Sequence, residues 1–305
     1  MRVLINGLPY FGKKIANELN EFDSDNSYVF LDTYYSKWDK IRFRLLLPFC
    51  GAVISFNGVS DRSGSLDLVL KKKKKLLMQW HGTDVQLAVE RFQKGELYAD
   101  YIRYAKHFFS APWFGRELKG IVDKGIYAPF SYVDQIGNDT RYDELSVLSY
   151  VAKGRESYYG WEEIKKAAVA YPEVVFMIVG SDGEGLSYPE NVRFEGWVSE
   201  DRMFYLYRHS PVFIRLCEHD GKAFSVSQAI AAGAEVIWNY PVTEEEGLTT
   251  VFNGDIIATL GELFTSIRER GMNPNSKNIK FAKDHLARAI VLNSYTALIK
   301  KAINE

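Results

Sequence analysis

The chain has 305 residues, 47% hydrophobic and 25% charged, which is the composition of a soluble globular protein long enough for two domains. Its 38 basic and 39 acidic side chains leave a net charge of −1, so nothing global favours nucleic acid and no nucleic-acid partner is expected. The two cysteines, Cys50 and Cys217, lie in apolar runs without metal-ligand spacing, which predicts free thiols in a reducing compartment and no metal site.

Short apolar runs alternate with helical stretches, which predicts an α/β protein with two doubly wound parallel sheets. The first set of expected strands covers residues 2–7, 28–32, 52–57, 76–81, 107–111 and 126–129. The second set covers 147–152, 174–180, 192–197, 211–216 and 235–238. A polar stretch over 135–144 is the expected linker, and an amphipathic helix or helix pair is expected over 279–303.

This pattern predicts a domain organisation with the ligand in a cleft between two Rossmann-like domains. The expected parts are an N-terminal acceptor-side domain over 1–140, a second domain over 141–280, and a terminal helix over 281–305.

The first strand leads into a glycine-containing loop and the start of a helix. Gly12 would let the backbone approach a ligand there, and Lys13 could reach a phosphate. A tight strand-to-helix connection explains the same residues, because the glycine spacing of a dinucleotide fingerprint is absent.

Residues 71–75 are all lysine and precede an expected core strand. A solvated loop that protects the end of a sheet is the favoured interpretation. The alternative is attraction to anionic lipid, which would suit an enzyme with a membrane-bound acceptor. Because no apolar run has the length of a signal peptide or a membrane span, we expect a cytoplasmic protein, peripheral at the inner membrane face under that alternative.

His81 ends the fourth expected strand, so it should stand at the carboxyl edge of the first sheet. A lone histidine is more often structural than functional. The position after an apolar strand and before Gly82 favours a substrate contact, with Asp84 shaping the loop or capping the next helix.

Two loops of the second half follow expected strands and carry chemistry suited to phosphate. Lys153 and Arg155 stand in the first, where a guanidinium can bond phosphate oxygens through two donors, although an exposed loop cation is the alternative. Gly180 and Gly183 stand in the second, a glycine-rich loop after the next strand.

Residues 215–233 are the most informative segment, because a charged turn lies between an apolar strand and a small-residue helix. The helix is expected over 224–232, and Gly233 is suited to end it. Its first N–H groups and its positive dipole end favour phosphate, while Asp220 and Gln228 can hydrogen-bond hydroxyl groups.

The turn itself contains Glu218, His219, Asp220 and Gly221 in succession. One carboxylate there could be a simple cap. The whole succession before a helix favours a binding or catalytic site.

This segment resembles the signature of retaining GT-B glycosyltransferases of the family-4 type, in which two acidic residues separated by seven residues precede a small-residue helix and glycine. Asp220 takes the first acidic position and Gln228 the second, where the family usually has a glutamate that grips the ribose hydroxyls. A neutral amide replaces a charged bidentate acceptor there. The resemblance implies transfer of a hexose, with retention, from a nucleotide-diphosphate sugar such as a UDP-sugar to a glycan or lipid-linked acceptor, without a metal.

The resemblance also implies residue roles. His81, Glu218 and Asp220 are the implied catalytic residues, with His81 hydrogen-bonded to the transferred sugar. Arg155 would hold the pyrophosphate, and Lys153 could replace a family lysine whose place before Gly160 is taken by Tyr159. The implied donor-binding residues are Gly12, Lys13, Lys153, Arg155, Gly180, Gly183, Trp197, Val198, His219, Gly221, Phe224, Ser225, Val226 and Gln228.

Two alternatives remain open at this stage. One is a catalytically inactive GT-B subunit that binds nucleotide or glycan and supports a partner. The other, less favoured, is a sugar-nucleotide epimerase, which would call for more acid and base groups than this set provides. Backbone groups near Trp197 and Val198 would meet the base, so the side chains do not reveal which base is bound.

Overall fold

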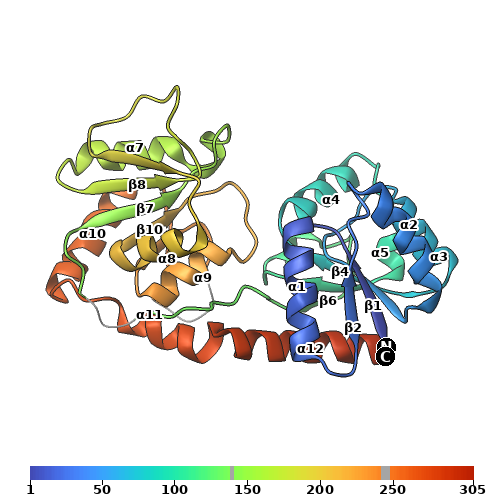
Figure 1. The fold of residues 1–305 in the computed structure, drawn as a ribbon. Coiled ribbons are helices and arrows are strands. Elements are labelled where there is room, and N and C mark those ends of the chain that lie inside the picture. Colours follow the sequence, from blue (N-terminus) through green and yellow to red (C-terminus); the bar gives the residue numbers. More distant parts are fainter. Residues whose placement is uncertain (138–140, 242–247) are drawn as a thin grey trace. The chain divides into compact units, whose positions relative to one another are not determined.

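The computed structural model describes residues 1–137, 141–241 and 248–305, and within them the chain forms two compact units (Figure 1). Unit 1 contains Met1–Phe130 and Ala289–Glu305, and unit 2 contains Ser131–Arg288. The divisions therefore fall before residue 131 and before residue 289, where the sequence analysis places them after residues 140 and 280. A backbone hydrogen bond accounts for the different boundaries. The amide of Val133 donates to the carbonyl of Leu286 at 2.8 Å, so the segments around these two residues pair with each other and belong together to unit 2.

Unit 1 has a six-stranded parallel sheet in the order β2-β1-β3-β4-β5-β6. Its strands are β1 (Arg2–Asn6), β2 (Ser27–Phe30), β3 (Ala52–Ser55), β4 (Lys75–Trp80), β5 (Lys106–Phe109) and β6 (Gly125–Tyr127). Its helices are α1 (Pro9–Phe22), α2 (Lys37–Leu46), η1 (Leu47–Phe49), α3 (Gly64–Lys71), α4 (Thr83–Gln93), α5 (Asp100–Tyr104), α6 (Phe114–Glu117) and the C-terminal α12 (Arg288–Asn304). All six strands expected in this half are confirmed, because buried parallel strands are apolar nearly throughout.

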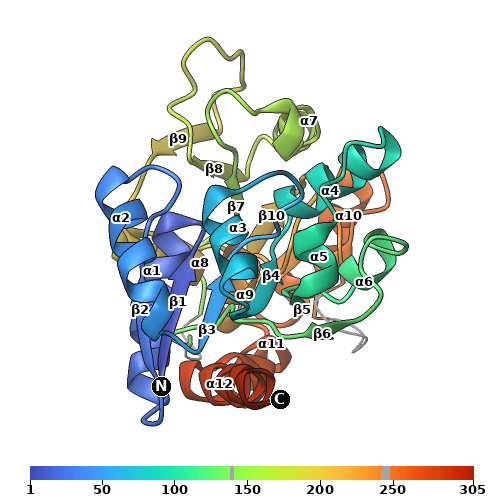
Figure 2. The same cartoon turned by 90° about the vertical axis from the view of Figure 1, so that its right-hand side faces the viewer.

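The last helix, α12, packs on unit 1. The hydroxyl of the buried Tyr295 donates to Gln79 Oε1 at 3.3 Å, and Lys75 Nζ donates to the carbonyl of Ile303 at 2.6 Å. A lysine at this place satisfies a carbonyl in the last turn of α12, which has no partner within the helix. Figure 2 shows both chain termini on the same side of unit 1.

Unit 2 has a second six-stranded parallel sheet in the order β12-β11-β10-β7-β8-β9. Its strands are β7 (Ser146–Tyr150), β8 (Val175–Val179), β9 (Val192–Gly196), β10 (Val212–Arg215), β11 (Glu235–Trp238) and β12 (Thr250–Val251). Its helices are η2 (Ser157–Tyr159), α7 (Trp161–Ala170), α8 (Glu200–His209), α9 (Phe224–Ala232), α10 (Ile256–Glu269), α11 (Ser276–Phe281) and the π-turn η3 (Ala282–Leu286). Five of these strands match the expected ones, and β12 is additional.

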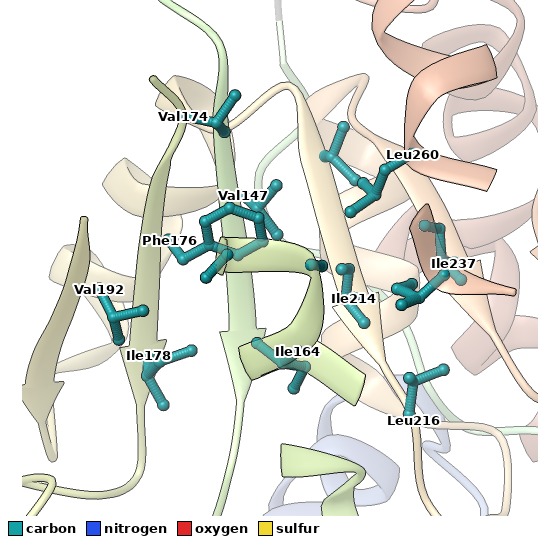
Figure 3. Close-up of a cluster of buried hydrophobic side chains, with 14 of the residues drawn as sticks. Val147, Ile164, Val174, Phe176, Ile178, Val192, Ile214, Leu216, Ile237 and Leu260 are labelled. Carbon is teal, nitrogen blue, oxygen red and sulfur yellow. The ribbon is translucent and has the colours of Figure 1, made fainter. Parts of the chain in front are cut away.

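The core of unit 2 lies between its sheet and the helices α7 and α10 (Figure 3). Fully buried side chains from four strands meet one from each helix: Val147, Phe176, Ile214, Ile237, Ile164 and Leu260. Each such burial contributes roughly 1.5–3 kcal/mol to stability. This packing holds β7, β8, β10 and β11 in register, and so fixes where their carboxyl ends lie.

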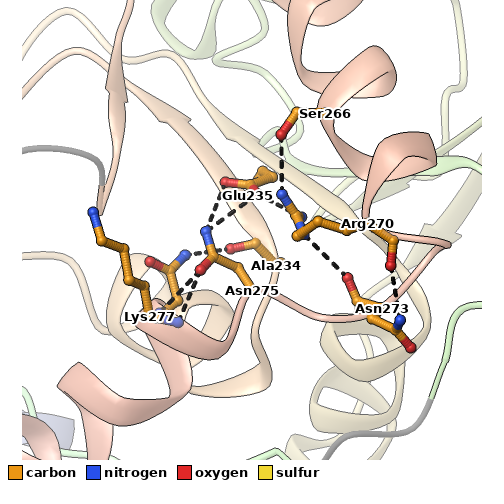
Figure 4. A network of polar contacts seen from close by, with 8 residues as sticks. Ala234, Glu235, Ser266, Arg270, Asn273, Asn275 and Lys277 are labelled. Atoms are coloured by element: carbon orange, nitrogen blue, oxygen red, sulfur yellow. Dashed lines mark hydrogen bonds and ion pairs between the residues drawn. The ribbon is translucent and has the colours of Figure 1, made fainter.

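A polar network fixes the amino end of β11 (Figure 4). The buried Glu235 carboxylate accepts Arg270 Nη2 at 2.6 Å and Asn275 Nδ2 at 3.2 Å, and Arg270 also donates to Ser266 Oγ at 3.1 Å. Asn275 additionally caps α11 by accepting the amide of Lys277 at 3.0 Å. The carboxylate of Glu235 is therefore paired with a cation although it is buried. This pairing gives Glu235 a structural role, at the end of the sheet opposite the carboxyl edge.

Candidate functional site

Both sheets contain a point where the strand order reverses at the carboxyl edge. In unit 2 the reversal lies between β7 and β10, and in unit 1 it lies between β1 and β3. Open parallel sheets bind ligands outside the carboxyl ends of the strands at such points. The loops after β7, β8, β9 and β10 carry most of the expected donor-binding residues, so these share one edge of unit 2.

Among the described residues, no side chain caps the amino end of α9. The N-cap residue Ala223 makes no capping hydrogen bond, and no acidic residue stands in the first turn. The neighbouring α8, α10 and α11 are capped by Ser199, Asp255 and Asn275. Within the described part of the chain, no side chain therefore competes with an anion for the first N–H groups of α9, around Ser225 and Val226, and the helix dipole favours an anion there.

Lys222 stands just before this helix and was not singled out from the sequence. Burial lowers the pKa of Lys222 to about 8, because the charged ammonium is partly removed from water. At neutral pH the side chain still carries most of its positive charge. In the sequence it stands two residues before Phe224, the first residue of α9.

Asp220 is held by an internal ion pair. Arg215 Nε donates to Asp220 Oδ2 at 2.5 Å and Arg215 Nη2 donates to Asp220 Oδ1 at 3.2 Å. The thiol of Cys217 and the indole N–H of Trp238 also donate to this carboxylate, at 3.3 and 3.2 Å. The coulombic attraction and hydrogen bonds of Asp220 outweigh burial and raise the pKa of Arg215. These contacts fasten the turn to the ends of β10 and β11.

Arg155 reaches the same turn through an aromatic neighbour. Its guanidinium lies over the ring of Tyr158, 4.0 Å from the ring centroid. The hydroxyl of Tyr158 donates to the carbonyl of His219 at 2.6 Å, and its own carbonyl accepts the amide of Glu218 at 3.1 Å. The structure thus brings together Arg155, Glu218 and His219, although they are far apart in sequence.

Lys153 is engaged elsewhere. Its ammonium bonds Asp182 and Glu184, each at 2.8 Å, and these hydrogen bonds raise the pKa of Lys153. An incoming phosphate would have to displace both carboxylates. The expectation that Lys153 takes over the role of the family lysine missing before Gly160 stays a prediction, and its pairing with two carboxylates does not favour it.

The two glycines of the β8 loop are required by packing and conformation. Gly180 has φ of +89° and Gly183 has φ of +75°, both in the region that favours glycine. A Cβ at Gly180 would lie 2.8 Å from the ring of Tyr150, and one at Gly183 would lie 2.6 Å from the ring of Phe194. Because these two residues lack side chains, the loop can pack closely against Tyr150 and Phe194.

Trp197 is the most exposed aromatic residue of this edge, with 78% of its surface accessible. It lies edge-on to Tyr150, with ring centroids 6.3 Å apart. An exposed indole face can stack on a planar ring. Val198, next to Trp197 in the loop after β9, is half-buried. Of the expected residues in α9 and its turn, Phe224 and Gln228 are half-buried, and Gly221 and Val226 are buried.

In unit 1, His81 follows β4 and is enclosed by aromatic rings. Its ring lies 4.5 Å from that of Phe56 and 5.1 Å from that of Phe130. The residue is half-buried, but its Nε2 is shielded from solvent and has no hydrogen-bond partner among the described residues. Burial lowers the pKa of His81 to about 4, so the ring is neutral at pH 7 and Nε2 is an unused polar atom.

Asp84 shapes the loop after β4, as predicted. Its carboxylate accepts the backbone N–H groups of Gly58 at 2.6 Å, His81 at 3.0 Å and Gly82 at 2.7 Å. This joins the loop after β3 to the loop after β4.

The expected loop at Gly12 is a helix instead. Pro9 occupies the first turn of α1, where proline is favoured, so the helix begins earlier than the sequence analysis places it. A Cβ at Gly12 would lie 2.6 Å from the ring of Phe30 and 2.9 Å from the carbonyl of Gly7. Helix-to-strand packing thus accounts for Gly12. Lys13 is exposed on the same helix.

Across residues 1–137, 141–241 and 248–305, no three His, Cys, Asp or Glu side chains are grouped so that they could hold a metal ion. Over the same ranges, none of the helices combines the length and the apolar character needed to cross a bilayer.

No protein-family model matches this chain, and no curated protein matches it. Solved structures do. The sucrose-phosphate synthase of Thermosynechococcus elongatus superposes with a TM-score of 0.73 at 11% identity, over 100% of this chain and 99% of that one. The lipopolysaccharide outer core galactosyltransferase WaaB gives 0.61 at 13% identity, over 99% of both chains.

The pneumococcal O-GlcNAc transferase GtfA, solved in complex with UDP and GlcNAc, gives a TM-score of 0.60 at 12% identity. The match covers 89% of this chain but only 61% of that enzyme, so the chain spans about three fifths of its length. These similarities, together with the two parallel sheets, show that the fold is GT-B, the two-domain α/β fold of glycosyltransferases. The expected fold class is confirmed.

Proposed function

We propose that this protein is a retaining glycosyltransferase that moves a hexose from a nucleotide-diphosphate sugar to a glycan or lipid-linked acceptor. The observation that carries the proposal is the start of α9 at the reversal point of unit 2, which no described side chain caps and which Lys222 precedes in the chain. This is an anion site at the edge where such sheets bind nucleotides. The GT-B fold and the UDP bound to the pneumococcal enzyme support a UDP-sugar as the first donor to test.

In this proposal the diphosphate lies at the start of α9 and the guanidinium of Arg155 bonds its oxygens. Trp197 offers a face for the base, and Gln228 on α9 bonds the ribose hydroxyls. Positive groups placed before the reaction stabilise the charge that develops on the leaving diphosphate, and this is commonly the largest contribution to the rate. The cations of the chain supply this charge in our proposal, without a metal.

The proposed reaction occurs on one face of the sugar. The bond between C1 and the diphosphate oxygen breaks, the acceptor oxygen bonds C1 from the same side, and the acceptor proton passes to the departing phosphate. No pair of free carboxylates is needed for this route. Asp220, which receives donors from Arg215, Cys217 and Trp238, acts as a positioning residue for the turn.

His81 and Glu218 are the remaining proposed catalytic residues. The shielded Nε2 of His81 has no partner among the described residues, and a sugar hydroxyl would supply one. Glu218 is exposed on the turn before α9. Its backbone amide donates to the carbonyl of Tyr158, whose ring lies under the guanidinium of Arg155.

The test is calorimetric titration with UDP, GDP and ADP, followed by incubation of each hexose donor with the protein. Binding of one nucleotide diphosphate, and release of that nucleotide from its sugar donor, supports the proposal. A chain that binds none of the three contradicts it.

A catalytically inactive nucleotide-binding subunit is the second candidate. Two observations favour it: Lys153 is paired with Asp182 and Glu184, and a neutral Gln228 replaces the family's glutamate. Tight binding of a donor without any turnover would select this alternative.

A further inference from the structure

Helix α2 and the turn η1 of unit 1 expose large apolar side chains on one face. Trp38 is 77% exposed, Leu45 is 66% exposed and Phe49 is 76% exposed, with the exposed Ile41 between the first two. Separations of three and four residues place such side chains on the same side of a helix. The opposite side is buried through Phe43, which belongs to the core.

Basic side chains flank this apolar face. Residues 37–46 contain Lys37, Lys40, Arg42 and Arg44. The single acidic residue of the helix, Asp39, bonds Arg42 at 2.9 Å and the backbone amide of Asp32 at 3.0 Å, so its charge is already used. Since the whole chain has a net charge of −1, this positive surface is local to α2.

The lysine run 71–75 extends the same surface. Lys74 Nζ donates to the carbonyls of Pro48 at 2.9 Å and Cys50 at 2.7 Å, which places the run next to Phe49. Lys71, Lys72 and Lys73 of the same run are exposed and add positive charge to this part of unit 1. The sequence analysis favours a solvated loop for these lysines, whereas their neighbours in the structure favour the lipid alternative.

The charged side chains that line a pocket of about 370 Å³ between α2 and α3 are also mainly positive. Lys40, Arg44 and Arg62 line it, together with Asp61. The carboxylate of Asp61 is paired with Arg91 at 3.0 Å, so the three cations dominate the pocket.

We propose that α2, η1 and residues 71–75 form a surface that binds an anionic lipid bilayer. Trp38, Leu45 and Phe49 enter the boundary between headgroups and acyl chains, and the flanking cations contact lipid phosphates. A helix with an apolar face and a basic flank binds in the plane of a membrane, and aromatic rings are favoured at that depth. Opposite charge selects an anionic bilayer over a neutral one.

The experiment is co-sedimentation of the full chain with vesicles of phosphatidylglycerol and phosphatidylcholine, or of phosphatidylcholine alone, at low and high salt. No sugar donor is present, so the result does not depend on the proposed transfer reaction. We expect binding only to the anionic vesicles, weakened by salt. Replacing Trp38, Leu45 and Phe49 by alanine should lower the partition coefficient about tenfold or more, as should changing Lys37, Lys40 and Arg44 to glutamate.

The matched control replaces Leu87, Phe92 and Tyr104 by alanine, three apolar residues of unit 1 that are exposed outside this surface. It should bind vesicles like the wild type. Equal binding to neutral and anionic vesicles would overturn the proposal. So would equal losses of vesicle binding in the control and in the Trp38 variant, in which Trp38, Leu45 and Phe49 are all replaced by alanine. Self-association that is abolished by the Trp38 variant, without vesicle binding, would also overturn it and identify the surface as a contact between copies of the chain.

Discussion

Arg215 bonds the carboxylate of Asp220 through two nitrogens, and this pair determines the shape of the turn that precedes α9. Both side chains are largely buried, with 13% and 12% of their surfaces exposed. A buried ion pair of this kind is costly to break, because one charge remains without a partner. The residue that the sequence analysis assigns to chemistry thus holds the start of α9 in place.

We expect the Arg215→Lys variant to lose about 2–4 kcal/mol of unfolding free energy, because an ammonium cannot replace the two-nitrogen fork. Denaturant unfolding measures this loss. Arg202→Lys is the control, because Arg202 pairs with Glu195 at 2.9 Å on the surface, where such a change costs less than about 1 kcal/mol. Equal losses of unfolding free energy in the two variants would show that the pair between Arg215 and Asp220 contributes no more to stability than a surface ion pair.

The Arg155→Ala variant should weaken the binding of UDP about tenfold or more and the binding of uridine little, because the proposed partner is the diphosphate. Calorimetric titration with both ligands gives the two ratios. The control is Arg193→Ala, which removes an exposed guanidinium from β9 of the same unit. Loss of uridine affinity as large as that of UDP would remove Arg155 from the diphosphate site.

UDP affinity should fall as the pH rises through about 8, because the pKa of Lys222 is lowered to that value and its charge is lost above it. The phosphate charge itself is constant in this range, since its second pKa is near 6. Titrations between pH 7 and 9.5 in the wild type and in Lys222→Met measure the slope. The variant should bind more weakly at pH 7 and show no such slope. A slope that survives the substitution would assign it to another group.

Stability should fall as the pH drops from about 6.5 to about 4, because the pKa of His81 is about 4 in the folded chain and near 6.5 when unfolded. In this window the unfolded chain binds a proton that the folded chain does not. The contribution amounts to about 3 kcal/mol. Denaturant unfolding at several pH values should show a shallower pH dependence for His81→Gln than for the wild type. The exposed His285 provides the matched variant, His285→Gln, which should retain the wild-type profile.

The sheets could be predicted from the sequence because a strand buried on both faces, such as Val3-Leu4-Ile5, leaves a continuous apolar run. β12 could not, since Thr250 and Val251 are too few to make a pattern. The start of α1 was misplaced because Pro9 reads equally as a turn residue and as the first residue of a helix.

The site was less accessible to sequence reasoning. The engagement of Lys153 by Asp182 and the contact of Arg155 with Tyr158 depend on loops that only the folded sheet brings together. Local spacing gives the residue types at a strand end. It does not show which of their charges are already paired.

The most direct test of the proposed activity is donor turnover followed by NMR, with UDP-, GDP- and ADP-hexoses and a simple alcohol in place of the unknown acceptor. The proposal predicts release of one nucleotide diphosphate, together with a glycoside whose anomeric configuration matches that of the donor. A glycoside of inverted configuration would contradict retention, and the absence of turnover with every donor would contradict the glycosyltransferase itself.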